Sequence, residues 1–354
     1  MTFWRKYLFI FLILAGCLTS CKKDIPPQKP LATGSITSTR KLIICNEGNF
    51  GSGNATVTLY DPLSGVIVPD AYTPVNSNQY IGDVIESGKK FNEKYFWVVN
   101  NSKKIVVTDK NFVKLTFITG FISPRYIEFV SNNKAYVSNL QLSPTAANYV
   151  QVLDVNTNTI SKTIHINGWT EQMVQSYGKV FVTNMLRNYV YVIDASTDML
   201  IDSINVNATN ACIVKDQNEK LWVSCNGDSV NNIPARLVKI NPIDHQVENS
   251  ILLGTTKNSI SNLVTNGTEN TLYYIMNDVY KISITASAAP AAPFIQQGNR
   301  TFYGLCIDPV DETVYVSDAI DHNQDGNILR YKSDGSYVST FKAGISPGFM
   351  WVDE

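Results

Sequence analysis

Phe181-Val182-Thr183-Asn184 is an apolar strand end that closes on a hydroxyl side chain and an amide, and similar steps recur along the chain. The seven steps are Ile43-Ile44-Cys45-Asn46, Trp97-Val98-Val99-Asn100, Tyr136-Val137-Ser138-Asn139, Phe181-Val182-Thr183-Asn184, Trp222-Val223-Ser224-Cys225, Tyr274-Ile275-Met276-Asn277 and Tyr315-Val316-Ser317-Asp318. Their last positions (46, 100, 139, 184, 225, 277 and 318) are 54, 39, 45, 41, 52 and 41 residues apart. One four-stranded propeller blade has a repeat of about 45 residues, so the spacing indicates seven blades.

The sequence between the steps also has the pattern of a blade. A polar loop follows each step, and after it comes a second alternating strand such as Tyr189–Asp194, a tight turn and an outer strand. We therefore predict an all-β fold, a seven-bladed β-propeller with blades of four antiparallel strands. Phe349–Val352 has the pattern of one more strand, so we expect both termini to share a blade and close the ring. A pair of β-sandwiches or a β-solenoid is the alternative.

The first twenty residues have the pattern of a lipoprotein signal peptide. Arg5 and Lys6 precede the apolar run Leu8–Leu14, which is too short to span a bilayer as a helix. Cys17 and Cys21 each follow the small residues that a lipoprotein signal peptidase requires. The Lys-Lys-Asp sequence after Cys21 resembles the start of many lipoproteins of the Bacteroidota. We therefore predict lipidation at Cys21, with Cys17 as the alternative.

This pattern sets the expected order of segments. We expect a signal peptide at residues 1–20, a lipidated flexible tether at 21–40 and the propeller at 41–354. The tether contains Pro26, Pro27 and Pro30 and cannot bury a core. The predicted location is the outer membrane, with the domain exposed at the cell surface and the lipid as its only membrane contact.

Composition argues against several classes of partner. Charged residues make up 17% of the chain and the formal net charge is -1, so no strong field attracts nucleic acid. Cys45, Cys212, Cys225 and Cys306 lie in apolar, strand-like sequence and are expected to be buried thiols, with disulfides as the alternative. With only three histidines and no Cys-x-x-Cys pair, we expect no metal site and no cofactor.

Enzymatic chemistry is poorly supported by the sequence. No nucleophile elbow, phosphate loop or His-Glu-x-x-His pair stands out, and we predict a protein that is not an enzyme. The segment Asp321–Asp325 matches the first half of a calcium loop, but Lys332 stands where a bidentate Glu is needed. An ordinary Asp- and Asn-rich hairpin loop is the alternative reading of this segment.

The binding residues are predicted from loop position. Loops that follow the seven steps and loops that enter each innermost strand meet at one end of a propeller, and here they are rich in aromatic and amide side chains. Such side chains suit a large, polar, uncharged ligand or a protein surface, although Asn and Gly also occur in turns for conformational reasons. The predicted ligand-binding residues are Asn46, Asn49, Phe50, Tyr80, Asn100, Arg125, Tyr126, Asn139, Trp169, Asn184, Arg187, Asn210, Tyr303 and Phe349.

Two family resemblances add to this interpretation. The seven steps resemble the YVTN repeat, which builds propellers. The segments Asn46–Ala55, Asn76–Asp83, Ser123–Tyr126 and Gly344–Gly348 resemble a group of propeller lipoproteins of the Bacteroidota. That group includes the BtuG-type surface proteins, which capture cobalamin and pass it to a TonB-dependent outer-membrane transporter. The resemblance implies the same fold and a similar role.

The sequence is compatible with three functions. The first is a ligand-capturing lipoprotein that binds cobalamin or another corrinoid and works with a TonB-dependent transporter. The second is a structural or protein-interaction propeller similar to surface-layer proteins. An enzyme is the third, because propellers also carry hydrolases and lyases.

Overall fold

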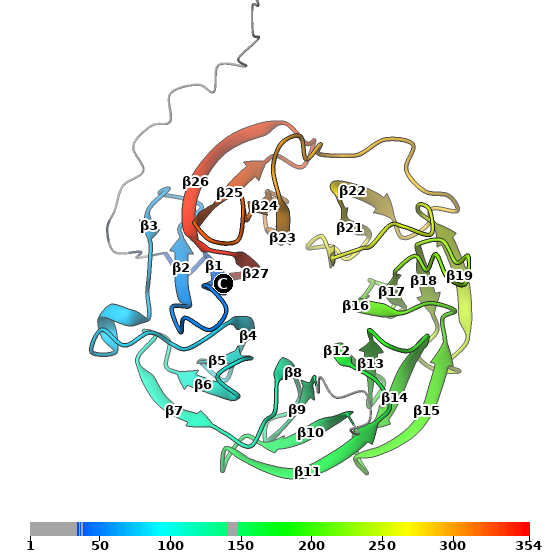
Figure 1. The fold of residues 1–354 in the computed structure, drawn as a ribbon, viewed down its shortest axis with the longest axis horizontal. Helices are drawn as coiled ribbons and strands as arrows, with labels where there is room; N and C mark the ends of the chain where they lie inside the picture. Colours follow the sequence, from blue (N-terminus) through cyan, green and yellow to red (C-terminus); the bar gives the residue numbers. More distant parts are fainter. Residues whose placement is uncertain (1–33, 35, 37, 141–147) are drawn as a thin grey trace, which may run out of the picture. The chain divides into compact units, whose positions relative to one another are not determined.

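The computed structural model describes residues 34, 36, 38–140 and 148–354. These residues form a ring of seven antiparallel sheets, and the predicted seven-bladed propeller is confirmed (Figure 1). The predicted signal peptide, Cys21, Cys17 and the first part of the tether lie outside the described residues. Within the described part, no helix is long and apolar enough to cross a membrane.

Each sheet presents its first strand to the centre of the ring. The innermost strands are β4 (Ile85–Phe91), β8 (Pro124–Ser131), β12 (Thr170–Ser176), β16 (Asn210–Lys215), β20 (Asn262–Thr265), β23 (Phe302–Ile307) and β27 (Pro347–Asp353). The second strands are β1 (Lys41–Asn46), β5 (Lys94–Val99), β9 (Lys134–Asn139), β13 (Lys179–Asn184), β17 (Leu221–Cys225), β21 (Thr271–Met276) and β24 (Val314–Asp318). All seven sequence steps therefore lie at the ends of second strands.

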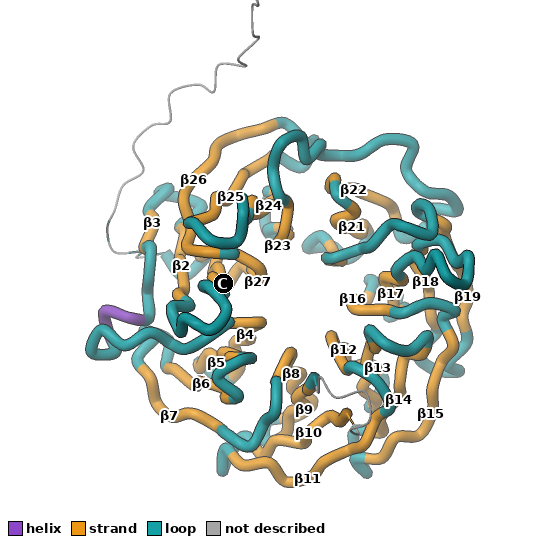
Figure 2. Tube along the Cα trace, in the orientation of Figure 1, coloured by secondary structure: helices purple, strands orange, loops and turns teal. Residues whose placement is uncertain are grey.

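The remaining strands complete the blades toward the outside, as the strand colouring of Figure 2 shows. The third strands are β2 (Thr56–Tyr60), β6 (Lys104–Thr108), β10 (Asn148–Asp154), β14 (Tyr189–Asp194), β18 (Arg236–Ile240), β22 (Asp278–Ser283) and β25 (Asp325–Tyr331). The outer strands are β3 (Ile67–Val68), β7 (Lys114–Ile118), β11 (Thr159–Ile166), β15 (Met199–Asn205), β19 (Val247–Leu252) and β26 (Tyr337–Ile345). One short 3-10 helix, Thr73–Val75, follows β3.

The sheet of β20, β21 and β22 has three strands, whereas the prediction was four in every blade. The segment after β22 returns along it but forms only one isolated bridge, between Val279 and Ile295. That segment contains Pro290 and Pro293. Proline has no backbone N–H to donate to a strand ladder, which explains why the fourth strand does not form.

The ring is closed by both ends of the domain, as predicted. Strand β27 pairs antiparallel with β1, with Lys41 opposite Asp353 and Ile43 opposite Trp351. The Asp353 carboxylate also forms ion pairs with Lys41 (3.0 Å) and Lys90 (2.9 Å) and accepts a hydrogen bond from Tyr95. The C-terminal strand is thereby attached to its own blade and to the next one.

The hydrophobic core consists of seven clusters, one between each pair of neighbouring blades. In one cluster, Trp97 of β5 packs against Trp351 of β27, with ring centroids 5.7 Å apart. Burial of such aromatic side chains between blades is the main favourable term for the ring. Cys45, Cys212, Cys225 and Cys306 are free and buried, as predicted.

Candidate functional site

A β-bulge lies near the start of six innermost strands. In β12, for example, Thr170 pairs with Asn184 and Met173 pairs with Val182, so two residues of β12 face one residue of β13. The corresponding irregularities are in β4, β8, β16, β23 and β27. A bulge re-aims the side chains beside it. The residues placed at these positions and lining the central cavity are Glu86, Arg125, Glu171, Ala211, Tyr303 and Gly348.

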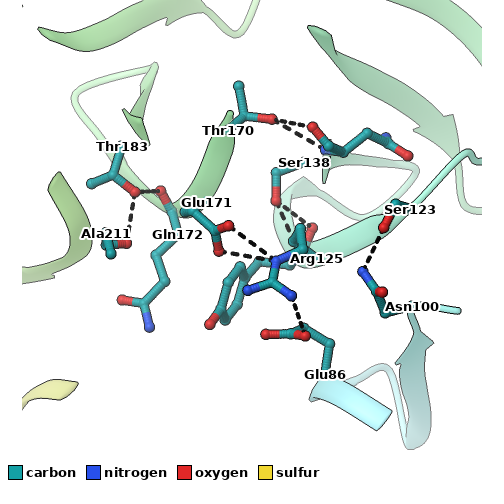
Figure 3. A network of polar contacts seen from close by, with 12 residues as sticks. Glu86, Asn100, Ser123, Arg125, Ser138, Thr170, Glu171, Gln172, Thr183 and Ala211 are labelled. Atoms are coloured by element: carbon teal, nitrogen blue, oxygen red, sulfur yellow. Dashed lines mark hydrogen bonds and ion pairs between the residues drawn. The ribbon is translucent and has the colours of Figure 1, made fainter. Parts of the chain in front are cut away.

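The hydroxyl residue of the repeated step supports the bulge. Ser138, Ser224 and Ser317 accept hydrogen bonds from backbone N–H groups of the facing bulges, at 3.0, 3.1 and 2.6 Å respectively. The Thr183 hydroxyl lies 3.0 Å from the carbonyl oxygen of Gln172 in the facing bulge and 2.8 Å from that of Ala211 in the bulge of the next blade (Figure 3). A buried backbone group that loses its ladder partner needs another one, and the hydroxyl supplies it.

Three amides that end steps, and the Asn210 amide at the start of β16, connect neighbouring segments rather than face solvent. Asn46, Asn139, Asn184 and Asn210 are fully buried. The Asn46 side chain donates to the Thr58 hydroxyl (2.8 Å) and accepts from the Gly344 N–H (3.0 Å), and the Asn210 side chain accepts from the Asn184 N–H (2.9 Å). These four predicted binding residues are therefore engaged in holding the fold, and we leave them out of the candidate site.

A cavity of about 740 Å³ lies at the centre of the ring. Its size is in the range of ordinary small-molecule sites. The bulge residues and Glu47 surround one end, and the walls beyond them include Met173, Leu263, Leu305 and Trp351. The cavity thus combines a polar cluster with an apolar wall.

Arg125 is held between two carboxylates of neighbouring blades, as Figure 3 shows. Its Nη1 forms an ion pair with Glu86, and its Nε donates to both oxygens of Glu171 at 3.1 Å. The Glu171 side chain is only 3% exposed. Although burial alone would lower the pKa of Arg125, the two carboxylates raise it above its usual value, so the guanidinium stays charged.

Glu47 is the third carboxylate of the cluster. It follows β1, and its Oε1 accepts a hydrogen bond from the Tyr303 hydroxyl at 2.6 Å. The Tyr303 ring in turn contacts His322 edge to face, with centroids 4.8 Å apart. A Cβ added at Gly348 would lie 2.5 Å from Glu47 Oε1, so a larger residue there would displace this carboxylate from its present position.

Burial changes the protonation of these acids. It raises the pKa of Glu47 to about 7, and the nearby Glu86 carboxylate adds to the effect. Burial also raises the pKa of Glu171 to about 7, although Arg125 opposes the change, and it raises the pKa of Glu86. Glu47 and Glu171 therefore titrate near neutral pH.

Four of the predicted binding residues come together in the cavity. Arg125, Tyr126, Tyr303 and Phe349 all line it. The Tyr126 and Phe349 rings meet edge to face at 6.3 Å, which places an aromatic pair beside the carboxylates. Arg125 was expected to contact a ligand, but its guanidinium already forms ion pairs with Glu86 and Glu171.

The other predicted residues lie on loops or between blades. Phe50 and Tyr80 are 77% and 54% exposed. Asn49 donates to the His322 carbonyl oxygen (3.3 Å), and Arg187 donates to Asn167 (3.3 Å). The remaining two are Trp169, whose carbonyl oxygen accepts the Met185 N–H, and Asn100, which donates to Ser123 and to the Pro124 carbonyl oxygen. None of these six lines the cavity.

Sequence reasoning missed Glu47, Glu86 and Glu171. Two of them lie close to a residue that was selected: Glu47 is beside Asn46, and Glu171 is two positions after Trp169. Whether Glu86 and Glu171 face the channel depends on the bulges of β4 and β12, which the sequence pattern did not reveal. For Glu171 the Thr183 hydroxyl of the facing step is a signal that could have indicated the bulge, whereas the step that faces Glu86 has no hydroxyl residue.

The calcium-like segment has a simpler arrangement. The Asp321 carboxylate accepts the backbone N–H groups of Asn323 (2.9 Å) and Gln324 (3.1 Å), as in an ordinary Asx turn. Among residues 34, 36, 38–140 and 148–354, no three His, Cys, Asp or Glu side chains gather in a way that could hold a metal ion.

Burial raises the pKa of the Cys212 thiol, which lines the cavity, to about 12.

A family described as "Domain of unknown function (DUF5074)" matches residues 41–342. The chain belongs to this family. No curated protein matches its sequence significantly. The match includes strands of every blade but ends before β27, so Gly348, Phe349 and Trp351 of the cavity lie beyond it.

Solved structures with the same fold come from several bacteria. A quinonprotein alcohol dehydrogenase-like protein from Bacteroides thetaiotaomicron is 14% identical with a TM-score of 0.69, over 90% of this chain and 79% of that chain. Apo AztD from Citrobacter koseri is 10% identical with a TM-score of 0.55, over 88% and 97%. Hydrazine synthase from Kuenenia stuttgartiensis is 12% identical with a TM-score of 0.57, over 75% and 88%. At these identities the likeness concerns the fold alone.

Proposed function

We propose that this protein is a ligand-capturing propeller lipoprotein that binds a small organic molecule in its central cavity. The observation that carries the proposal is the cavity itself, about 740 Å³, with a few converging polar groups at one end and an apolar wall. A pocket of this kind is the usual form of a small-molecule site. The bulges hold the polar groups on rigid strands, which favours recognition of one geometry.

Capture is a better account of the cavity than catalysis. The Cys212 thiol stays protonated because its pKa is about 12, and the Ser87 hydroxyl donates to the Arg125 carbonyl oxygen at 2.7 Å. Neither group is therefore an activated nucleophile. The carboxylates are arranged around Arg125 and Tyr303, as in a charged recognition cluster.

The N-terminal sequence supports the cellular part of the proposal. An apolar run followed by Cys21 and a proline-containing tether would hold the domain at a membrane surface. In that position the domain would collect its ligand and pass it to an outer-membrane transporter of the TonB-dependent class.

The test compares the unaltered mature domain with a variant whose cavity is filled. Ala211 lines the cavity from a bulge, so Ala211→Trp should occupy it, whereas Ala288→Trp places the same side chain on an exposed loop. Each protein is equilibrated with a bacterial metabolite extract, washed, denatured and analysed by mass spectrometry. We expect small molecules that are enriched by the unaltered domain and Ala288→Trp but not by Ala211→Trp. Equal enrichment by all three proteins would contradict the proposal.

A corrinoid bound at the rim is the second candidate. The observation that favours it is the exposure of Phe50 and Tyr80 on loops that Asp83 connects, since its carboxylate accepts the Gly51 N–H at 2.9 Å. A corrinoid is too large to enter the cavity whole, so it would stack on these exposed rings. Calorimetry with cyanocobalamin should then show micromolar affinity that Phe50→Ala weakens, and no heat of binding would remove this candidate.

A further inference from the structure

The groups that line the cavity carry more negative than positive charge. The acidic side chains are Glu47, Glu86, Glu128, Glu171 and Asp353, and the basic ones are Lys89, Lys90 and Arg125. Lys41 does not line the cavity but also pairs with Asp353 at 3.0 Å, so one negative charge is left unbalanced when all nine groups are ionised.

Each basic side chain already has an acidic partner. Arg125 binds Glu86 and Glu171, Lys89 binds Glu128, and Lys90 binds Asp353 at 2.9 Å. Glu47 forms no ion pair with any side chain in the described part of the chain. Its hydrogen-bond donor is the neutral Tyr303 hydroxyl. A mostly buried carboxylate in this situation is costly to ionise without a cation beside it.

We propose that the ligand captured in the cavity is an organic cation, whose amine or guanidine group lies beside the Glu47 carboxylate and whose apolar part packs on Phe349 and Trp351. This inference rests on the proposed function and specifies its ligand class. An anion would meet three carboxylates at this end of the cavity. A neutral ligand would leave Glu47 without a counter-charge.

The surrounding aromatic side chains favour the same ligand class. The Phe349 ring lies between Tyr126 (6.3 Å) and Trp351 (5.9 Å), and all three line the cavity. Aromatic faces attract a cation and also provide contact area for an apolar group. The same aromatic wall can therefore attract the charged amine of such a ligand and pack against its apolar part.

The test uses three probes that share an indole ring and differ in charge. Tryptamine is a cation at neutral pH, tryptophol is its neutral alcohol, and indole-3-acetate is an anion. Each is titrated calorimetrically at pH 8 into the unaltered domain, Glu47→Gln, Glu47→Asp and the exposed control Glu93→Gln. Thermal unfolding of every variant establishes that it is folded before it is titrated.

We expect tryptamine to bind at least about tenfold more tightly than tryptophol, and indole-3-acetate to bind weakest. Glu47→Gln should remove the preference for tryptamine over tryptophol, Glu47→Asp should keep part of it, and Glu93→Gln should keep all of it. The proposal is overturned if tryptophol binds as well as tryptamine, if Glu47→Gln keeps the preference, or if no probe binds at millimolar concentration. Captured metabolites that are excluded by Ala211→Trp but are not cations would overturn this inference and leave the proposed function standing.

Discussion

The Tyr303 hydroxyl donates a 2.6 Å hydrogen bond to Glu47 Oε1, although the two residues are 256 positions apart in the sequence. The contact joins two neighbouring blades: the blade of β27, β1, β2 and β3, and the blade of β23–β26. Tyr303 reaches the channel from the bulge of β23, and Glu47 follows directly after β1. The candidate site therefore depends on closure of the ring.

Replacing Tyr303 by Phe should weaken binding of tryptamine in a pH-dependent way. The hydrogen bond from Tyr303 lowers the pKa of Glu47, which burial has raised to about 7. Without it, less Glu47 is ionised at pH 7, and we expect an affinity loss of about tenfold, or about 1.4 kcal/mol. At pH 8.5 the loss should be smaller. Calorimetry at both pH values measures it, with the exposed Tyr177→Phe as control. Equal losses at the two pH values would argue against this role of Tyr303.

Replacing Arg125 by Met should lower the free energy of unfolding of the domain. Glu86 and Glu171 would stay buried without their shared cation, which we expect to lower the free energy of unfolding by about 3 kcal/mol at pH 8. The loss should shrink at pH 5.5, where the carboxylates take up protons. Urea denaturation measures it. Arg187→Met, at an exposed arginine with one 3.3 Å hydrogen bond, should cost less than about 0.5 kcal/mol, and a similar cost at Arg125 would contradict the account.

Stability should depend on pH through Glu171. Its folded-state pKa of about 7 lies above its ordinary value of 4.5, so the folded state binds the extra proton between these pH values. Its contribution is complete below about pH 4.5 and is lost as the pH rises through 7. Glu171→Gln should therefore gain stability relative to the unaltered domain as the pH is raised from 5 to 8, as followed by urea denaturation.

Asp194→Asn is the matched control for this pH series. Turn hydrogen bonds from Ser196 and Thr197 lower the pKa of Asp194 to about 2, so its charge does not change between pH 5 and 8. The stability difference between Asp194→Asn and the unaltered domain should stay flat over this range. A flat difference for Glu171→Gln as well would show that its pKa is not raised.

Removing Pro347–Glu354 should open the ring. The deletion takes away β27, exposes the edge of β1 and removes the Asp353 ion pairs with Lys41 and Lys90. We expect aggregation and loss of cooperative thermal unfolding. The point variant Asp353→Asn keeps the strand and should unfold cooperatively at a lower temperature. An unchanged unfolding temperature in the deletion would contradict closure by this strand.

Most of the fold could be predicted from local sequence. The seven steps end second strands, and Phe349–Val352 lies in the closing strand, because hydrophobic alternation and repeat length are properties of nearby residues. The fourth strand after Ser283 was expected and did not form, since the prolines that follow remove ladder donors.

The site was predicted only in part. Arg125, Tyr126, Tyr303 and Phe349 were selected because they enter inner strands, and the structure brings them together. Glu86 and Glu171 were missed because their direction is set by bulges, and a bulge is a property of two paired strands. Glu47 was missed for a related reason, since its partner Tyr303 lies in another blade.

A crystal structure of the domain with tryptamine would test the central claim most directly, because it places the ligand. The account predicts density inside the central cavity, with the amine within hydrogen-bond distance of the Glu47 carboxylate and the indole against Phe349 or Trp351. Density confined to the rim beside Phe50 and Tyr80, with the cavity containing solvent alone, would contradict it.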